Sequence, residues 1–286
     1  VLAEQRGELE LAYSQIKDLA KPESSVAYEA HLWVAQHIDS GQIEQDNPQA
    51  AQLLKDALRA AIAQRDTEPG PRIWLAQLYA AEGKHDDVTE LLSRLHLQWL
   101  SPGQRLQVAG LLRATGDRLE ASRVARSVLT HYEVLAQAAD SEPLSAQDAS
   151  MWAAAYEILD DYPKAVEVAA KALVDHPDDD DLRTGAMKLA EHALRVAAAR
   201  GALGVRDRWL VLDRMLEFAP DRGKVLEYIA RLADTPQEAE RVAELLEAEY
   251  SAGTLPASVC RKLGDLAVIK SDNSLARSWY SRAVEI

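Results

Sequence analysis

The sequence predicts an all-α protein in which short helical hairpins stack in a row. Three observations favour this fold class. Small residues that would open the second helix of each hairpin recur with a period of about 34 residues, with insertions. A glycine stands a few residues before several of these positions. The prolines fall where a helix would start or end, and none has to lie inside one. A single hairpin cannot bury both of its faces, so it needs neighbours like itself.

The hairpin at residues 146–177 shows the pattern most clearly. Trp152 and Tyr156 recur at helical spacing in its first helix, and Ala165 and Ala169 do so in its second. Small residues allow the two helix backbones to approach closely, while the aromatic rings fill the remaining space. We therefore expect two antiparallel helices joined by a tight turn.

The same markers recur along the chain. The small residues expected to open second helices are Ala12, Ala50, Val88, Ala121, Ala165, Ala239 and Ala276. Three of them follow a glycine by the same interval, namely Gly7, Gly83 and Gly116. Glycine at that point suits a left-handed residue that ends the first helix.

Taken in order, the hairpins are expected at residues 1–20 (a partial unit), 23–66, 69–100, 102–135, 146–177, 179–220, 222–251 and 255–286. They would form a single solenoid over residues 1–286, with about seven hairpins and about 14 to 15 helices. Segments 39–47 and 200–206 fit the pattern less well and are interpreted as inserts. The last hairpin ends on an apolar helix without a polar cap, so we expect this chain to be a piece of a longer solenoid or, alternatively, each end to be covered by another protomer.

The repeated units resemble the tetratricopeptide repeat family. The residues that carry the resemblance are Leu75, Ala76, Tyr79, Gly83 and Leu92 in one unit, Gly116 to Ala121 in the next, then Trp152, Tyr156, Ala165, Ala172 and Pro177, and finally Leu263, Gly264, Ala276, Tyr280 and Ala283. The resemblance implies antiparallel helix pairs stacked into a right-handed α-α superhelix. It also implies that the first helices line a concave groove where partner proteins or peptides bind.

Composition restricts the class of partner. The net charge of −14 argues against nucleic acid, because a nucleic-acid surface needs dense lysine and arginine to release counterions. It also argues against anionic membrane surfaces. No apolar run approaches the roughly 20 residues that span a bilayer, so we expect no membrane insertion in this segment. The single cysteine, Cys260, leaves both the cytoplasm and a bacterial periplasm open as compartments.

No constellation of residues predicts catalysis. Gly201 and Gly204 lack the third glycine and the preceding strand of a phosphate loop. His31 and His37 stand at i and i+6, on different faces of a helix, which disfavours a shared metal. Cys260 has no nearby histidine to activate it, so we interpret it as a core residue. We expect no enzyme activity, no metal and no cofactor.

The candidate binding residues are those that the resemblance places on the concave side, namely Gln77, Arg113, Glu157, Lys224, Tyr228, Arg231 and Arg261. Lys224, Tyr228 and Arg231 stand at i, i+4 and i+7 and share one helix face. Arg261 comes about one repeat later and would extend this strip. A basic, aromatic strip suits an acidic peptide or a free carboxylate. The alternative is that these cations pair with local acids such as Glu227 and Asp265.

Two functional classes follow. The first is a non-catalytic scaffold for protein–protein interaction, which docks a partner on its concave groove or on its edges. The second is a structural spacer or assembly module of a larger complex, such as a bacterial envelope secretion or polysaccharide export system, with end-to-end self-association. A catalytic or transport activity elsewhere in a longer chain is a third possibility.

One tryptophan differs from the others in its position. Trp99 lies beside Leu100 and Pro102 at a helix end, where we expect it to be partly exposed to a partner.

Overall fold

The structure is a computed structural model of the chain, and it describes residues 16, 18–21, 24–40, 48–138, 143–200, 204–231, 241–242, 244–248 and 255–285. Every regular element within these residues is a helix, so the all-α prediction is confirmed. The chain divides into two compact units, Val1–Gln137 and Ala138–Ile286. That the two form one continuous solenoid remains a prediction.

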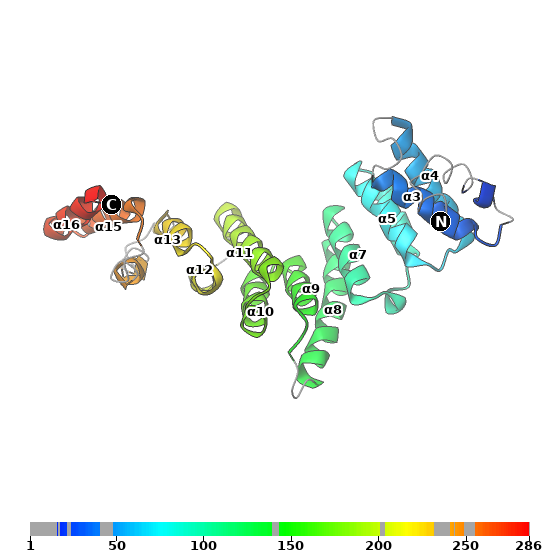
Figure 1. Ribbon diagram of the computed structural model, residues 1–286. Helices are drawn as coiled ribbons and strands as arrows, with labels where there is room; N and C mark the ends of the chain where they lie inside the picture. Colours follow the sequence, from blue (N-terminus) through cyan, green and yellow to red (C-terminus); the bar gives the residue numbers. More distant parts are fainter. Residues whose placement is uncertain are drawn as a thin grey trace. The chain divides into compact units, whose positions relative to one another are not determined.

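The first unit is built from hairpins that pack side by side. Its elements are α3 (Ala27–Asp39), α4 (Pro48–Gln64), α5 (Pro69–Ala81), α6 (His85–Ser93), the 3-10 helix η1 (Leu97–Trp99), α7 (Pro102–Ala114) and α8 (Arg118–Ala138). Helix α3 pairs with α4 (Figure 1), and α5 pairs with α6. Between hairpins, α5 packs against both α4 and α7. Each hairpin therefore covers the open side of the one before it.

The second unit repeats this scheme. Its helices are α9 (Ala146–Ile158), α10 (Tyr162–Asp175), α11 (Asp180–Arg200), α12 (Val205–Phe218), α13 (Arg222–Arg231), α15 (Ala257–Ile269) and α16 (Asn273–Glu285). The pairs α9–α10, α11–α12 and α15–α16 form hairpins (Figure 1). First helices contact first helices, as in α9–α11 and α13–α15, and second helices contact second helices, as in α10–α12. This neighbour-to-neighbour packing is that of a helical-hairpin repeat protein.

Four hairpin turns within the described residues share one backbone geometry. Gly83 and Gly116 have φ values of 73° and 94°, so the left-handed conformation predicted for them is confirmed. Gly7 lies outside the described residues. Asp160 and Ser271 take the same conformation without being glycine, at φ values of 60° and 61°, and they stand at the equivalent position of their own hairpins.

Hydrogen bonds close these turns in the same way. In the α5–α6 turn the amide of Lys84 donates to the Tyr79 carbonyl at 2.9 Å, and in the α15–α16 turn the amide of Asp272 donates to the Ala267 carbonyl at 2.9 Å. The Asp272 side chain then caps the next helix by accepting from the Leu275 amide at 2.9 Å. The left-handed residue and the helix cap together reverse the direction of the chain within a few residues. The two helices of the hairpin therefore run antiparallel.

The core follows the small-residue pattern of the sequence. Ala165, Ala169 and Ala172 are buried on α10, where α10 faces α9, α11 and α12. Trp209 and Trp279 are 2% and 4% exposed and act as the inter-helix filler that the sequence predicts. Prolines stand at helix boundaries where the chain is described, for example at the first residue of α4, α5 and α7. Pro22 and Pro236, like most of the two predicted inserts, lie outside the described residues.

Candidate functional site

The most irregular part of the first unit is the connection between α6 and α7. Helix α6 ends at Ser93, and the chain then passes through η1 before α7 begins at Pro102. Trp99 lies in this connection and is 63% exposed, which makes it the only exposed tryptophan among the described residues. The expectation that Trp99 is exposed is therefore confirmed. Two pockets flank this connection.

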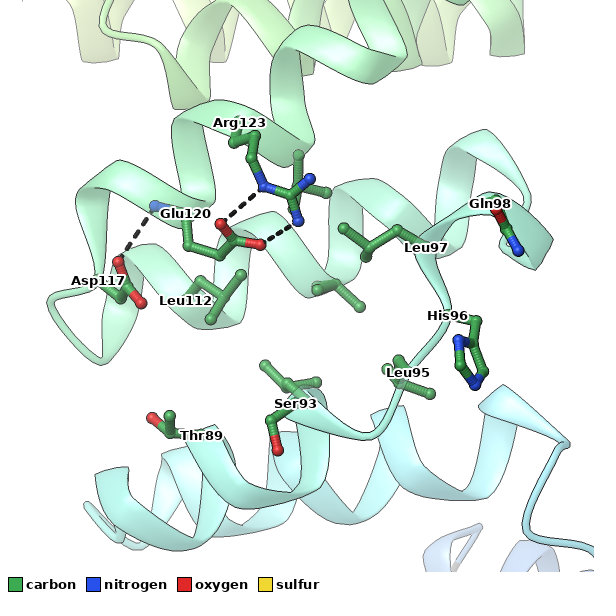
Figure 2. A pocket seen from close by; sticks show the side chains of 13 residues that line it. Thr89, Ser93, Leu95, His96, Leu97, Gln98, Leu112, Asp117, Glu120 and Arg123 are labelled. Atoms are coloured by element: carbon green, nitrogen blue, oxygen red, sulfur yellow. Dashed lines mark hydrogen bonds and ion pairs between the residues drawn. The ribbon is translucent and has the colours of Figure 1, made fainter.

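The larger pocket, which we call the α6–α8 groove, has a volume of about 610 Å³. Its lining residues are Thr89, Leu92, Ser93, Leu95, His96, Leu97, Gln98, Val108, Leu112, Asp117, Glu120, Arg123 and Val124. Figure 2 shows Thr89 and Ser93 of α6 on one side of the opening, Leu112 and Glu120 on the other, and the connection at one end. The interior is aliphatic and the rim is polar, which is the usual composition of a protein-binding groove.

Charges on the rim of the groove largely satisfy one another. The Arg123 Nε donates to Glu120 Oε2 at 2.8 Å, and a second, shorter contact joins the same two side chains (Figure 2). The hydrogen bond from Arg123 lowers the pKa of Glu120, and the same bond raises the pKa of Arg123. Asp117 accepts from the Glu120 amide at 3.1 Å and caps α8. This side of the groove is therefore polar without an excess of positive charge.

The smaller pocket, which we call the Arg72 pocket, has a volume of about 170 Å³. It is lined by Asp66, Thr67, Pro69, Arg72, Arg94, Leu95, His96, Trp99 and Leu100. Leu95 and His96 also line the α6–α8 groove, so the two pockets meet at the connection. A single bound segment that crosses the connection would contact both.

The residues predicted for the concave groove are distributed over both units. In the first unit, Gln77 is exposed on α5 and Arg113 is half-buried on α7, and these two helices pack together. In the second unit, Glu157 on α9 is half-buried, and its carboxylate lies 3.8 Å from the His192 Nε2. Neither pocket includes any of these residues. The concave groove itself remains a prediction.

The basic strip of the second unit occupies two neighbouring helices. Lys224 is exposed on α13, and Tyr228 packs partly against the core of the unit. Arg231 is the last residue of α13. Arg261 is exposed on α15, which packs against α13.

Two acids near this strip, Glu227 and Asp265, accept hydrogen bonds from hydroxyl groups. Glu227 accepts a hydrogen bond from the Ser258 hydroxyl at 2.7 Å. Asp265 accepts one from the Tyr280 hydroxyl at 2.7 Å. Lys224 pairs instead with Asp221, at 3.5 Å. The binding role of the strip remains a prediction.

Residues considered for chemistry serve the fold. Cys260 is fully buried, and burial raises the pKa of its thiol, as expected for a core cysteine. His37 stacks on Trp33 with ring centroids 3.7 Å apart. Within the described part of the chain, no three histidine, cysteine, aspartate or glutamate side chains lie close enough to hold a metal ion. None of the helices described is both long enough and apolar enough to cross a bilayer.

Sequence reasoning missed most of both pockets. Trp99 was the one visible signal, because an aromatic residue beside a proline at a helix end has no neighbour to cover it. Arg72 and His96 gave no signal, since their positions depend on how the connection folds back over the start of α5. The early end of α6 at Ser93 could not be read from the aliphatic pattern either, because Leu95 and Leu97 continue that pattern beyond it.

Helix pairing, turn geometry and packing between hairpins define this chain as a helical-hairpin repeat protein with a tetratricopeptide-repeat-like fold. Similar solved structures include a tetratricopeptide repeat protein from Parabacteroides merdae, which is 14% identical, covers 90% of this chain and 92% of that chain, and has a TM-score of 0.44. Human IFIT1, solved as a dimer with PPP-AAAA, is 11% identical and covers 99% of this chain and 80% of that chain, with a TM-score of 0.36. Yeast Tom70 is 13% identical, covers 90% of this chain and 62% of that chain, and has a TM-score of 0.28.

This similarity concerns the helical architecture alone. No protein-family model matches the sequence, and no curated protein matches it either.

Proposed function

We propose that this chain is a non-catalytic scaffold that docks a segment of a partner protein, and that the α6–α8 groove is the docking site. The observation that carries the proposal is the open, aliphatic interior of the groove beside the exposed ring of Trp99. Protein interiors are packed to a density that leaves few spaces larger than a water molecule. An accessible aliphatic groove of about 610 Å³ is therefore a surface suited to an incoming side chain.

The segment that fits this groove carries apolar anchor residues. Leu92, Val108 and Leu112 form the buried part of its lining, and they offer only dispersion and hydrophobic contact. Trp99 adds a rigid ring at the end of the connection, and tryptophan is enriched among residues that dominate binding energy at interfaces. The predicted acidic character of the partner is supported by the adjoining Arg72 pocket.

The basic strip of α13 and α15 is a second proposed contact for the same kind of acidic partner. Its support is the packing of α13 against α15 and the exposure of Lys224 and Arg261. Its effect on binding would be electrostatic, so it would weaken as salt concentration rises. Reversal of charge at Lys224 and Arg261 together would lower the association rate more than it raises the dissociation rate.

A matched pair of threonine variants tests the groove. Thr89 is exposed, lines the groove and donates its hydroxyl to the His85 carbonyl. Thr130 is also exposed on α8, donates to the Arg126 carbonyl in the same way, and lies outside both pockets. Thr89→Arg fills the groove, whereas Thr130→Arg adds the same side chain elsewhere.

Peptides are selected from a displayed random library on the unmodified protein, and their affinities are then measured for both variants. We expect Thr89→Arg to weaken binding by about tenfold or more, which corresponds to about 1.4 kcal/mol, and Thr130→Arg to leave it unchanged. Equal binding to both variants, or a library that yields no binder, would contradict the proposal. The alternative, a spacer that stacks end to end, predicts self-association that grows with concentration in sedimentation velocity and is the same for both variants.

A further inference from the structure

The Arg72 pocket contains a buried cation without a carboxylate partner. Arg72 is 5% exposed although it lies in the first turn of α5. Its Nε donates to the backbone carbonyl of Asp66 at 3.2 Å. Among the described residues, no side-chain carboxylate forms an ion pair with the Arg72 guanidinium. Arginine keeps its charge at any physiological pH, and a buried charge is unfavourable unless it is paired.

The electrostatics around Arg72 show the same deficit of negative charge. Burial lowers the pKa of Arg72, and the neighbouring Arg94 lowers it further, while Asp66 opposes the shift. The guanidinium of Arg94 pairs with Glu90 at 2.8 Å, but its side chain is 61% exposed, so it remains accessible at the pocket. Asp66 is the acid that lines the pocket, and it would compete with any incoming anion.

The remaining walls suit a small ligand group with an apolar neighbour. His96 contacts the Trp99 ring with centroids 4.4 Å apart, and both residues line the pocket. The pocket lies at the start of α5, which begins at Pro69, so the positive end of that helix dipole faces the same region. A volume of about 170 Å³ is large enough for one acidic group, because a single water molecule needs only about 10 to 15 Å³ of such space.

We propose that the Arg72 pocket binds an oxyanion, a carboxylate or phosphate group, whose carrier places an apolar part on Trp99. A planar guanidinium offers parallel N–H donors that match the oxygens of either group. The identity of the carrier rests on the proposed function: because Leu95 and His96 line both pockets, the anion belongs to an acidic residue of the segment docked in the α6–α8 groove. The oxyanion site itself needs no docked segment.

A purely structural role for Arg72 makes a different prediction. If the guanidinium served only to hold the Asp66 carbonyl, added anions would leave its resonances unchanged apart from a general salt effect. The full chain, labelled with nitrogen-15, is therefore titrated with sodium acetate and with inorganic phosphate, at ionic strength kept constant with sodium chloride. The Nε–H resonance of Arg72 and the indole N–H resonance of Trp99 are followed by NMR.

We expect both resonances to move and to saturate with at least one of the two anions. Saturation with acetate identifies a carboxylate site, and saturation with phosphate alone identifies a phosphate site. Arg94→Gln removes one charge-assisted donor from the pocket and should weaken the apparent affinity about tenfold. Asp66→Asn removes the competing carboxylate and should strengthen it. Arg214→Gln is the matched control, because Arg214 also pairs with an acid on its own helix but lies outside both pockets, and it should leave the affinity unchanged.

Three results would overturn the inference: shifts that stay linear with both anions, equal affinities in Arg94→Gln and Arg214→Gln, or weaker binding in Asp66→Asn. All three variants change surface-accessible groups and keep Arg72 in place, so the test does not depend on the folding of an Arg72 variant. Because the probes are small anions, failure here is separate from failure of the peptide-docking test. Loss of peptide binding in Thr89→Arg with no anion saturation would leave the groove as the docking site and exclude the oxyanion site.

Discussion

The contact between Gly264 and Tyr280 gives the most direct test of how the hairpins pack. A Cβ added at Gly264 of α15 would lie 2.5 Å from Tyr280 Cε1 and 2.8 Å from Tyr280 Cδ1 and Cζ. Ordinary carbon–carbon contacts lie at about 3.5 to 4.0 Å, so the ring on α16 has to move by about 1 Å. The ring is held by its hydroxyl, which donates to Asp265 at 2.7 Å. Gly264→Ala therefore displaces either the Tyr280 ring or the two helices, α15 and α16, from each other.

The expected magnitude comes from two opposing effects. Overpacking of this kind costs about 1 to 3 kcal/mol, whereas replacing a mid-helix glycine with alanine stabilises a helix by about 1 kcal/mol. We expect Gly264→Ala to lower the free energy of unfolding by about 1 to 2 kcal/mol. Gly185→Ala in α11 is the matched control, because a Cβ there meets nothing within 4 Å. The control should raise stability by about 1 kcal/mol.

Urea unfolding separates the two effects. The fluorescence of Trp279, which is buried on α16 beside Tyr280, reports on the affected hairpin, and circular dichroism reports on all helices. In a Tyr280→Ala background the clash is absent, so Gly264→Ala should become as stabilising as Gly185→Ala. If Gly264→Ala alone raises the urea midpoint as much as Gly185→Ala does, then α15 and α16 do not approach each other as closely as described.

Three further predictions concern stability. Ser271→Gly relieves a left-handed residue and should raise the free energy of unfolding by about 1 kcal/mol in urea titration. Lys55 is 9% exposed and donates to Glu82 at 2.6 Å, so Glu82→Gln leaves Lys55 without its counter-charge. The free energy of unfolding should fall by about 1 to 2 kcal/mol. Lys84→Gln removes the exposed partner of Glu82 and should shift the urea midpoint less. Burial lowers the pKa of His31 below the value of about 6.5 that it has in the unfolded chain. The free energy of unfolding should therefore fall as the pH drops below that value. This fall between pH 7.5 and 5.5 should be smaller in His31→Gln.

The elements that the sequence predicted well depend on short stretches of chain. The turn at Gly116 needs a left-handed residue and a following aspartate cap, and both are visible in adjacent letters. The buried alanines of α10 recur at helical spacing, so the buried face of that helix could be read directly. Asp160 and Ser271 were missed as left-handed residues because neither is glycine, and only the shared hydrogen-bond geometry shows that they occupy the same place.

The candidate site was predicted poorly because it depends on spacing between hairpins. The exposure of Trp99 was expected from its position beside a proline. The groove beside it exists because α6 stops at Ser93 while α8 continues for 21 residues, so α6 covers only part of the facing surface. Arg72 lies in the first turn of α5, where an exposed arginine is normal, and it is buried at a pocket that residues from the connection at 94–101 also line.

The sequence by itself therefore determined the hairpins of this protein: helical period, glycine or aspartate at the turn, and small residues at the closest approach all act over a few neighbouring positions. Only the tertiary structure decided where the array leaves room for another molecule. The physical reason is that a helix or a turn is fixed by local backbone energetics, whereas an open groove and an uncompensated buried charge are properties of side chains brought together from distant positions. Such contacts arise after packing, and no local pattern encodes them.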